Sequence, residues 1–404
     1  MNPARIKLEL FCRGLKIDPS CELESDARPV LRTRAGLGSG LEIVLPSRMR
    51  VNAPVEEHFV RNTPYSLHKE RGAYVLRRDG KRVTRVRLPP RPGFYDLKTR
   101  SGKTMSTIGV MQGTYLAIYP GRVCSFWRRR PRENCRFCST GLNVGRSEAL
   151  DKTVDDVLEV ARAARKECGI TYVHFNTGYL EGGEIEFLEP FVRAVKENTG
   201  LLIGVQTTPA PNLDSYRRLA RLGVNNVSFC FELWDEKRLA EVCPGKSAEI
   251  GRDRYLEAIK FCRRYFPAVN GEIIAGLEPV ESTLEAIDWI TANGAQPTVC
   301  VFRPCLGTDL EDLAPPTPEE LVPVFRRQYE ACIRNGVPIG IAPNIRVSLV
   351  ILPEEGRSFS TDRSPAFRLG EARNAALRAA FRAVFKLQMG RARLGKTLEN
   401  QVRA

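Results

Sequence analysis

The sequence has no long apolar run, no charged tail, no internal repeat and only 3 histidines among its 404 residues. No run approaches the ~20 apolar residues that a membrane-spanning helix needs, so we expect no membrane contact. The opening residues MNPARIKLELFCRG lack the uninterrupted apolar core of a signal peptide. We therefore expect a cytoplasmic protein whose 12 cysteines are ligands or core residues rather than disulfide partners.

Basic residues are in excess, because 62 Lys and Arg against 47 Asp and Glu give a net charge of +15. An anionic partner such as nucleic acid would explain this charge. Arginine is spread along the whole chain, however, so a generally basic composition is the simpler explanation. The hydrophobic content of 43% and the charged content of 27% are typical of a globular protein. The length suits one large α/β barrel with an appendage.

Residues 1–113 show little helical periodicity and several short strand-like runs between prolines and glycines, which predicts a β-rich N-terminal region. The clearest runs are LEIVLP (41–46), GAYVLRR (72–78) and RVTRVRLPP (82–90). GLGSG (36–40) lacks the preceding strand and following helix of a phosphate-binding loop, so we interpret it as an ordinary loop.

Residues 114–353 alternate between apolar runs and helical segments. Strands are predicted at 114–121, 171–178, 201–210, 225–234, 270–279 and 297–307, each followed by a helix. Six or more such units in succession predict an α/β fold, with a full or partial (β/α) TIM-type barrel. Residues 354–404 are predicted to form a C-terminal helical extension, with a helix at 364–393 on the outside of the barrel.

Three cysteines, Cys124, Cys135 and Cys138, lie in one loop directly after the first predicted barrel strand. Ten residues separate the first two and two separate the last two, with no fourth cysteine or histidine nearby in the sequence. A structural zinc site normally has four protein ligands, so a zinc site here would be incomplete. An iron–sulfur cluster held by three thiolates keeps one iron open for a further ligand.

The position of this loop at the carboxyl end of the first strand is where barrel enzymes carry their functional residues. The loop resembles that of the radical S-adenosylmethionine (SAM) superfamily, and the barrel resembles the biotin synthase-like members. Phe137, just before the last cysteine, fits the family pattern, whereas the usual spacing is three residues and then two. The resemblance implies that Cys124, Cys135 and Cys138 bind a [4Fe-4S] cluster whose open iron is chelated by SAM. It also implies reductive cleavage of SAM to a 5′-deoxyadenosyl radical, with electrons from an external donor such as flavodoxin or ferredoxin.

The resemblance covers about residues 115–350 and assigns further cofactor contacts. Thr177 and Gly178 match the strand end that meets the methionine amine, although EGGE (181–184) is an alternative for that motif. Glu232 matches the position that binds the ribose hydroxyls, for which a carboxylate is a suitable acceptor.

A basic residue after that strand would pair with the methionine carboxylate. Arg254 is the first candidate, with Arg252 and Lys246 as alternatives. Gly276, in GEIIAGLEP, matches the strand motif on the adenine side.

Two further residues are candidate catalytic groups. His174 alternates with Tyr172 and Asn176, so we expect it to point into the barrel as an acid/base or substrate ligand, with a hydrogen-bonded core histidine as the alternative. Cys305 lies at the end of the sixth predicted strand, just past Pro304, and is a candidate second functional thiol.

Three function classes remain open at this point. The first is a radical SAM enzyme that acts on a small molecule. The second is a radical SAM enzyme that modifies RNA or a peptide, suggested by the net charge and the basic run WRRRPR (127–132). The third is a zinc-stabilised binding protein without activity. Sulfur insertion is not expected, because Asn270, and Gln206 or Thr207, occupy strand positions where biotin synthase carries the cysteines of an auxiliary cluster. Cobalamin-dependent methylation is not expected either, because no cobalamin-binding signature is present.

Overall fold

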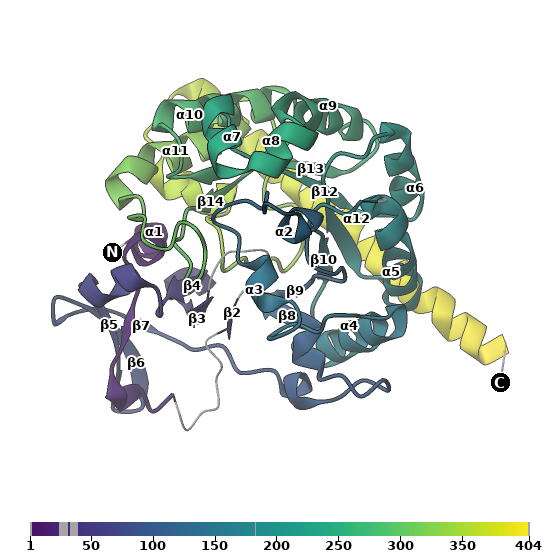
Figure 1. Cartoon of the computed structure of the whole chain (residues 1–404), viewed down its shortest axis with the longest axis horizontal. Coiled ribbons are helices and arrows are strands. Elements are labelled where there is room, and N and C mark those ends of the chain that lie inside the picture. Colours follow the sequence, from purple (N-terminus) through teal and green to yellow (C-terminus); the bar gives the residue numbers. More distant parts are fainter. Residues whose placement is uncertain (1, 24–30, 33–38, 182, 403–404) are drawn as a thin grey trace.

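The computed structural model describes residues 2–23, 31–32, 39–181 and 183–402. Its central element is a seven-stranded sheet with the strand order β14-β13-β12-β11-β10-β9-β8 (Figure 1). The strands are β8 (Gly109–Gln112), β9 (Tyr115–Ile118), β10 (Tyr172–Asn176), β11 (Leu202–Gln206), β12 (Asn226–Glu232), β13 (Ala268–Ala275) and β14 (Gln296–Val301).

Neighbouring strands from β9 to β14 pair in parallel, whereas β8 forms an antiparallel hairpin with β9. Because no pairing joins β14 to β8 among the described strands, the sheet is a curled half-barrel. The expected βα alternation is confirmed, and the barrel is partial. The predicted N-terminal region ends at residue 113, so it includes β8, which the structure places in the barrel sheet.

Long helices follow the strands and cover the outer face of the sheet (Figure 1). In β10, Val173 and Phe175 are fully buried and point toward these helices, while the alternate residues face the interior. The first long helix starts at a capping box, in which Thr153 and Asp156 satisfy each other's backbone amides. The main covering helices are α4 (Val154–Cys168), α5 (Glu184–Thr199), α6 (Tyr216–Arg221), α9 (Arg252–Cys262), α10 (Val280–Ala292) and α11 (Pro318–Arg334).

An irregular segment, residues 337–352, runs along the side of the half-barrel that the strands leave open. Its backbone is fixed at one end because Arg346 O accepts the amide of Thr114 at 3.0 Å. The approach requires Gly113, whose φ is 77° and whose added Cβ would lie 1.8 Å from Arg346 O. This segment therefore closes the wall of the barrel without joining the sheet.

The N-terminal residues form two small sheets, β1-β5-β6-β7 and β2-β3-β4, and one helix, α1 (Pro3–Arg13). The strands are β1 (Lys16–Ile17), β2 (Leu31–Arg32), β3 (Ser39–Val44), β4 (Arg50–Pro54), β5 (Tyr65–Glu70), β6 (Ala73–Arg78) and β7 (Lys81–Val86). The sequence interpretation missed α1. Asn2 caps the helix and Pro3 begins it, but IKLEL (6–10) alternates between apolar and charged residues, a pattern typical of a strand. Lys7 is fully buried and donates to Glu355 and to the carbonyl of Val347, each at 2.8 Å. Most of GLGSG lies outside the described residues.

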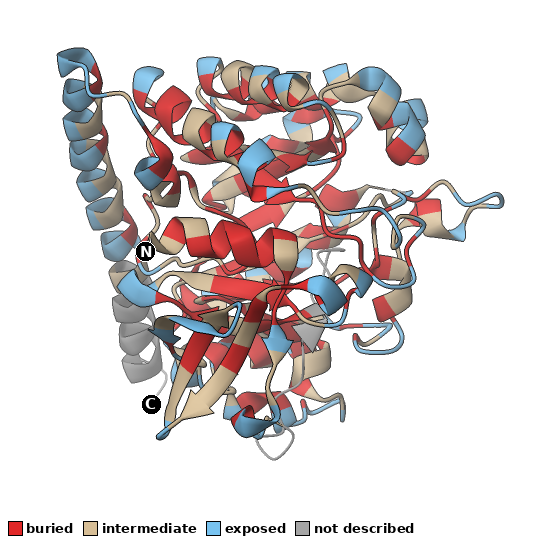
Figure 2. Ribbon diagram, turned by 90° about the vertical axis from the view of Figure 1, so that its left-hand side faces the viewer, coloured by how far each residue is buried: buried red, intermediate tan, exposed pale blue. Residues whose placement is uncertain are grey.

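The C-terminal helix α12 (Pro365–Val402) is longer than predicted. It lies across the end of the barrel where the strands begin, because Phe385 packs in one buried cluster with Leu202, Ala268 and Ile341. Figure 2 shows that much of its outward surface is exposed. In the described part of the chain, no helix is long and apolar enough to cross a membrane.

Candidate functional site

The loop with the three cysteines lies beyond the carboxyl end of β9. Cys124 immediately precedes the short helix α2 (Ser125–Arg128), and Cys138 precedes α3 (Thr140–Asn143). Burial, and then the neighbouring thiols Cys138 and Cys135, raise the pKa of Cys124 to about 12. The thiols of Cys135 and Cys138 are therefore near enough to Cys124 to act on it electrostatically.

Gly178, after β10, packs directly against this loop. A Cβ built at Gly178 would lie 2.5 Å from the Cβ of Cys124 and 3.1 Å from its Sγ. The amide of Gly178 donates to the hydroxyl of Tyr119 at 3.2 Å, and that hydroxyl donates to the carbonyl of Arg122 at 3.0 Å. Thr177 is buried and bonds to the carbonyl of Gln206 on β11. The absence of a side chain at Gly178 therefore allows the cysteine loop to sit close to the strand end.

A fourth cysteine, Cys243, lies beside Cys135 although it is distant in the sequence. The hydrogen bond from Cys243 is the largest cause that lowers the pKa of Cys135, while burial keeps the pKa of Cys243 well above its ordinary value. Cys243 is thus a protonated thiol next to Cys135. Among the residues that the structure describes, no three His, Cys, Asp or Glu side chains form a group that could hold a metal ion.

The ten residues between Cys124 and Cys135 fold back over their own loop. Phe126 stacks on Tyr179 with ring centroids 4.4 Å apart, and the guanidinium of Arg129 lies 5.1 Å above Phe126. Trp127 covers Gly141, where an added Cβ would lie 2.4 Å from the indole ring. The other side of Trp127 is covered by Arg132 at 5.3 Å. The aromatic residues of this insertion therefore pack against Tyr179 and Gly141 on either side of the cysteine loop.

The alternative motif EGGE lies farther along the same loop. Gly182 is outside the described residues, and Glu184 begins α5. The carboxylate of Glu184 accepts from the amide of Leu180 and from the hydroxyl of Thr208. Glu184 is thus engaged in holding the loop.

At the rim of the barrel, Glu232 ends β12 with a positive φ of 69°. Lys246 donates to Glu232 at 2.5 Å and to the carbonyl of Cys230 at 2.8 Å. Both charged side chains are largely buried. The structure thus brings Glu232 together with Lys246, the last of the three basic candidates.

The two arginine candidates have other partners. Arg254 donates to the carbonyls of Ala210 and Pro211 and pairs with Glu257. Arg252 donates to the carbonyl of Trp234 and lies over its ring. The role of Arg254 at the methionine carboxylate stays a prediction.

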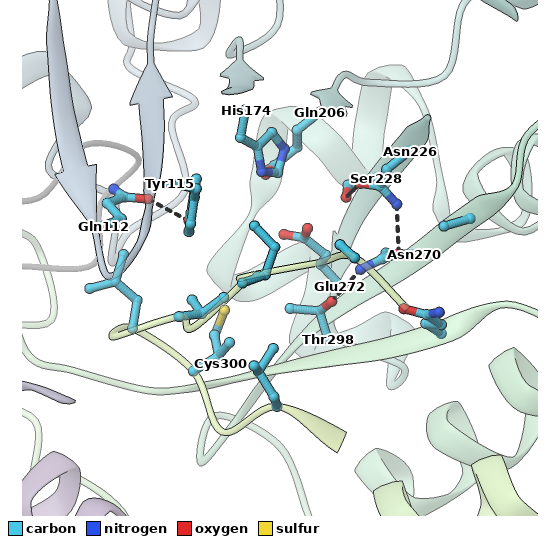
Figure 3. A pocket seen from close by; sticks show the side chains of 18 of the residues that line it. Gln112, Tyr115, His174, Gln206, Asn226, Ser228, Asn270, Glu272, Thr298 and Cys300 are labelled. Carbon is cyan, nitrogen blue, oxygen red and sulfur yellow. Dashed lines mark hydrogen bonds between the residues drawn. The ribbon is translucent and has the colours of Figure 1, made fainter. Parts of the chain in front are cut away.

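A cavity of about 270 Å³ occupies the interior of the half-barrel (Figure 3). Phe137 and Glu232 line its rim, and Tyr172, His174 and Asn176 point into it from β10, as the alternation predicted. Burial lowers the pKa of His174 to about 4, and its Nε2 is buried with no hydrogen-bond partner among the described residues. His174 is therefore a neutral imidazole with a free polar atom inside the barrel.

The floor of the cavity is a chain of paired polar side chains. Asn226 donates to Asn270 at 2.8 Å, and Asn270 donates to Thr298 at 2.9 Å. The hydroxyl of Tyr172 reaches Asn226 at 3.3 Å, and only a glycine at 204 leaves room for this ring, since a Cβ there would lie 1.7 Å from the hydroxyl. These groups satisfy one another and form a rigid base.

Nearer the rim, Cys230 links two strands. Gln206 donates to Cys230 at 2.7 Å, and Cys230 donates to the carboxyl of Glu272 at 2.8 Å. Burial raises the pKa of Glu272. Sequence reasoning did not single out Glu272, although its alternation with Asn270 on β13 was a signal that it faces inward.

The two remaining candidate residues, Cys305 and Gly276, are not among the residues that line the cavity. Cys305 is buried and donates to the carbonyl of Arg303. Cys300, on β14, does line the cavity. Gly276 follows β13 with a φ of 103°, and a Cβ there would lie 2.6 Å from Pro316, so its main role in this structure is close packing.

The class of protein follows from comparison with known families. Residues 129–290 match the family model of the Radical SAM superfamily, and the chain therefore contains a radical SAM domain. A curated relative, the bacteriochlorophyllide c C-7(1)-hydroxylase of Chlorobaculum limnaeum, is 31% identical over 115 residues. That match covers 28% of this chain and 29% of the relative, less than a third of its length.

Solved structures with similar folds include methylornithine synthase, with a TM-score of 0.43 and 19% identity over 58% of this chain and 71% of that one. Coproporphyrinogen III oxidase from Escherichia coli, described as a radical SAM enzyme, has a TM-score of 0.34 and 16% identity over 45% of this chain and 44% of that one.

The cofactors of a radical SAM domain are a [4Fe-4S] cluster and SAM. The residues present fit these groups, because Cys124, Cys135 and Cys138 lie in one loop beyond the carboxyl end of β9 and Gly178, without a side chain, lets the backbone approach Cys124 closely. The Glu232–Lys246 pair lies at the rim of the same cavity.

Proposed function

We propose that this protein is a radical SAM enzyme that acts on a small molecule held inside the half-barrel. The observation that carries the proposal is the loop of Cys124, Cys135 and Cys138 beyond the carboxyl end of β9, whose Phe137 lines a cavity with many polar side chains inside the half-barrel. When bound, the cluster and SAM would supply a 5′-deoxyadenosyl radical that abstracts a hydrogen atom from the substrate.

The residues around the cysteines support distinct roles in this function. The backbone at Thr177 and Gly178 would face the methionine amine, and Glu232 would accept hydrogen bonds from the ribose hydroxyls. Lys246 pairs with Glu232 and fixes its orientation. Phe137, from the cysteine loop, closes one side of the rim.

Inside the barrel, His174 would contact the substrate or transfer a proton at Nε2. The buried neutral imidazole suits hydrogen bonding to a polar substrate atom. Excluding water from this space would protect a reactive carbon centre from side reactions. The cavity has the size of a small-molecule site rather than of a groove for a polymer. We further propose an external electron donor and a cytoplasmic location.

Anaerobic reconstitution with iron and sulfide tests this function. We expect about four irons per chain and formation of 5′-deoxyadenosine from SAM and dithionite. Replacing any one of Cys124, Cys135 or Cys138 with alanine should abolish that product, whereas Cys168→Ala, outside the cysteine loop, should not. A triple variant with full 5′-deoxyadenosine formation, or stoichiometric zinc without iron in the unmodified protein, would refute the proposal.

A further inference from the structure

The charged side chains that line the cavity are acidic. Among the described residues that line it are three carboxyl side chains, from Glu232, Glu272 and Glu354, and neither a lysine nor an arginine. Glu232 is paired with Lys246. Glu354 lies near Arg378 and Arg346, which act on it electrostatically. For Glu272, the cation that acts on it is Lys246, which is already paired with Glu232, and the carboxylate of Glu232 opposes its effect.

Glu272 lies halfway along β13 and points into the same space as His174 on β10 (Figure 3). The described residues form no ion pair with it within 4.0 Å, and its bonded neighbour is the thiol of Cys230 at 2.8 Å. A buried carboxyl group without a cation is costly to ionise. A positively charged ligand group would offset that cost and is the natural complement of this position.

The opposite wall has a different chemistry. It is formed by the irregular segment 337–352, whose side chains that line the cavity are almost all apolar. They are Ile341, Ala342, Ile345, Val347, Leu349, Val350, Ile351 and Leu352. The cavity therefore has a polar wall of strand residues and an apolar wall, and it suits a ligand that is polar at one end and hydrocarbon elsewhere.

Two classes of substrate do not suit the charge and shape of this cavity. A phosphate or a free carboxylate would be buried beside the carboxyl group of Glu272 with no lysine or arginine among the described residues that line the cavity. A polymer could not pass through the barrel, because the end where the strands begin is closed by α12 through Phe385.

We infer that the half-barrel binds a small aliphatic amine, with its ammonium group on Glu272 and its hydrocarbon part against the segment 337–352. This inference names the substrate class of the proposed function and rests on it. His174 Nε2 then remains available for a second polar atom of the ligand.

Three probes with the same chain and different head groups test the inference: n-hexylamine, n-hexanol and hexyl phosphate. Their binding to the reconstituted full-length protein can be measured by calorimetry. Hexylamine should bind at least about tenfold more tightly than hexanol, as expected when a neutral hydrogen bond becomes a charge-assisted one. Hexyl phosphate should bind more weakly than either.

The isosteric variant Glu272→Gln should remove the preference for the amine and leave hexanol binding within about twofold. Glu197→Gln, an exposed carboxylate on α5, is the matched control and should change nothing. The three-probe comparison on the unmodified protein stands even if Glu272→Gln does not fold.

Equal affinity for amine and alcohol, tighter binding of the phosphate, or binding of none of the probes would overturn the inference. Failure of the proposed function is seen separately, as loss of iron or of 5′-deoxyadenosine in the same preparation. A protein that loads its cluster and cleaves SAM but shows no amine preference refutes only the substrate class.

Discussion

The contact between Gly178 and Cys124 gives the sharpest test of the site geometry. In Gly178→Ala, the new methyl group would lie 2.5 Å from the Cβ of Cys124 and 3.1 Å from its Cα and Sγ. Ordinary carbon–carbon contacts are about 3.5–4.0 Å. The strand end and the cysteine loop must therefore separate by about 1 Å. Part of the obstruction is backbone, so rotation of a side chain cannot relieve it.

Overpacking of this kind costs about 1–3 kcal/mol of folding free energy. The effect on the cluster should be larger, because a metal-binding constellation tolerates displacements of only about 0.5 Å. We therefore expect Gly178→Ala to fold with a modestly reduced unfolding free energy in urea. It should retain well under half of the iron and sulfide of the unmodified protein after anaerobic reconstitution.

Gly121→Ala is the matched control in the same loop. A Cβ there would make only ordinary contacts, the nearest at 3.7 Å to Phe187, and the residue has no positive φ. This variant should load iron normally. If Gly178→Ala binds as much iron as Gly121→Ala, the close packing of the strand end on Cys124 is not needed for the cluster, and our account of the site is wrong.

Three further changes probe other parts of the structure. Lys246→Met should cost about 3 kcal/mol in urea unfolding, because it leaves Glu232 unpaired, and the double variant with Glu232→Gln should recover most of that loss. His174 has a pKa of about 4 in the folded protein, so as the pH falls the unfolded chain takes up a proton at this histidine before the folded protein does. The free energy of unfolding should therefore fall as the pH drops from about 6.5 to 4. His174→Asn should flatten that part of the pH profile. Phe385→Ala should cost about 3 kcal/mol, measured by thermal unfolding, because it opens a cavity beneath the barrel.

Each of these expectations has a clear contrary result. A double variant no more stable than Lys246→Met would show that the cost is packing rather than an unpaired charge. If the free energy of unfolding of His174→Asn depends on pH as in the unmodified protein, other groups cause the loss of stability at low pH. Full stability of Phe385→Ala would mean that α12 contributes little to closing the barrel.

The sequence alone determined the order of strands and helices in the barrel, since hydrophobic periodicity is a local property of each segment. It also placed the three cysteines after the first strand and predicted that His174 faces inward, because alternation along a strand fixes which side chains share a face. It missed α1 because IKLEL (6–10) alternates between apolar and charged residues as a strand does, and only the tertiary structure buries the charged Lys7.

Only the tertiary structure decided which distant residues meet. It placed Cys243 beside Cys135, chose Lys246 as the partner of Glu232, and brought Glu272 and the segment 337–352 to opposite walls of one cavity. No short-range pattern encodes these contacts, because they depend on how far the sheet curls and on which chain fills the gap that six parallel strands leave open. The charge balance of the cavity, and with it the inferred substrate class, follows from that packing.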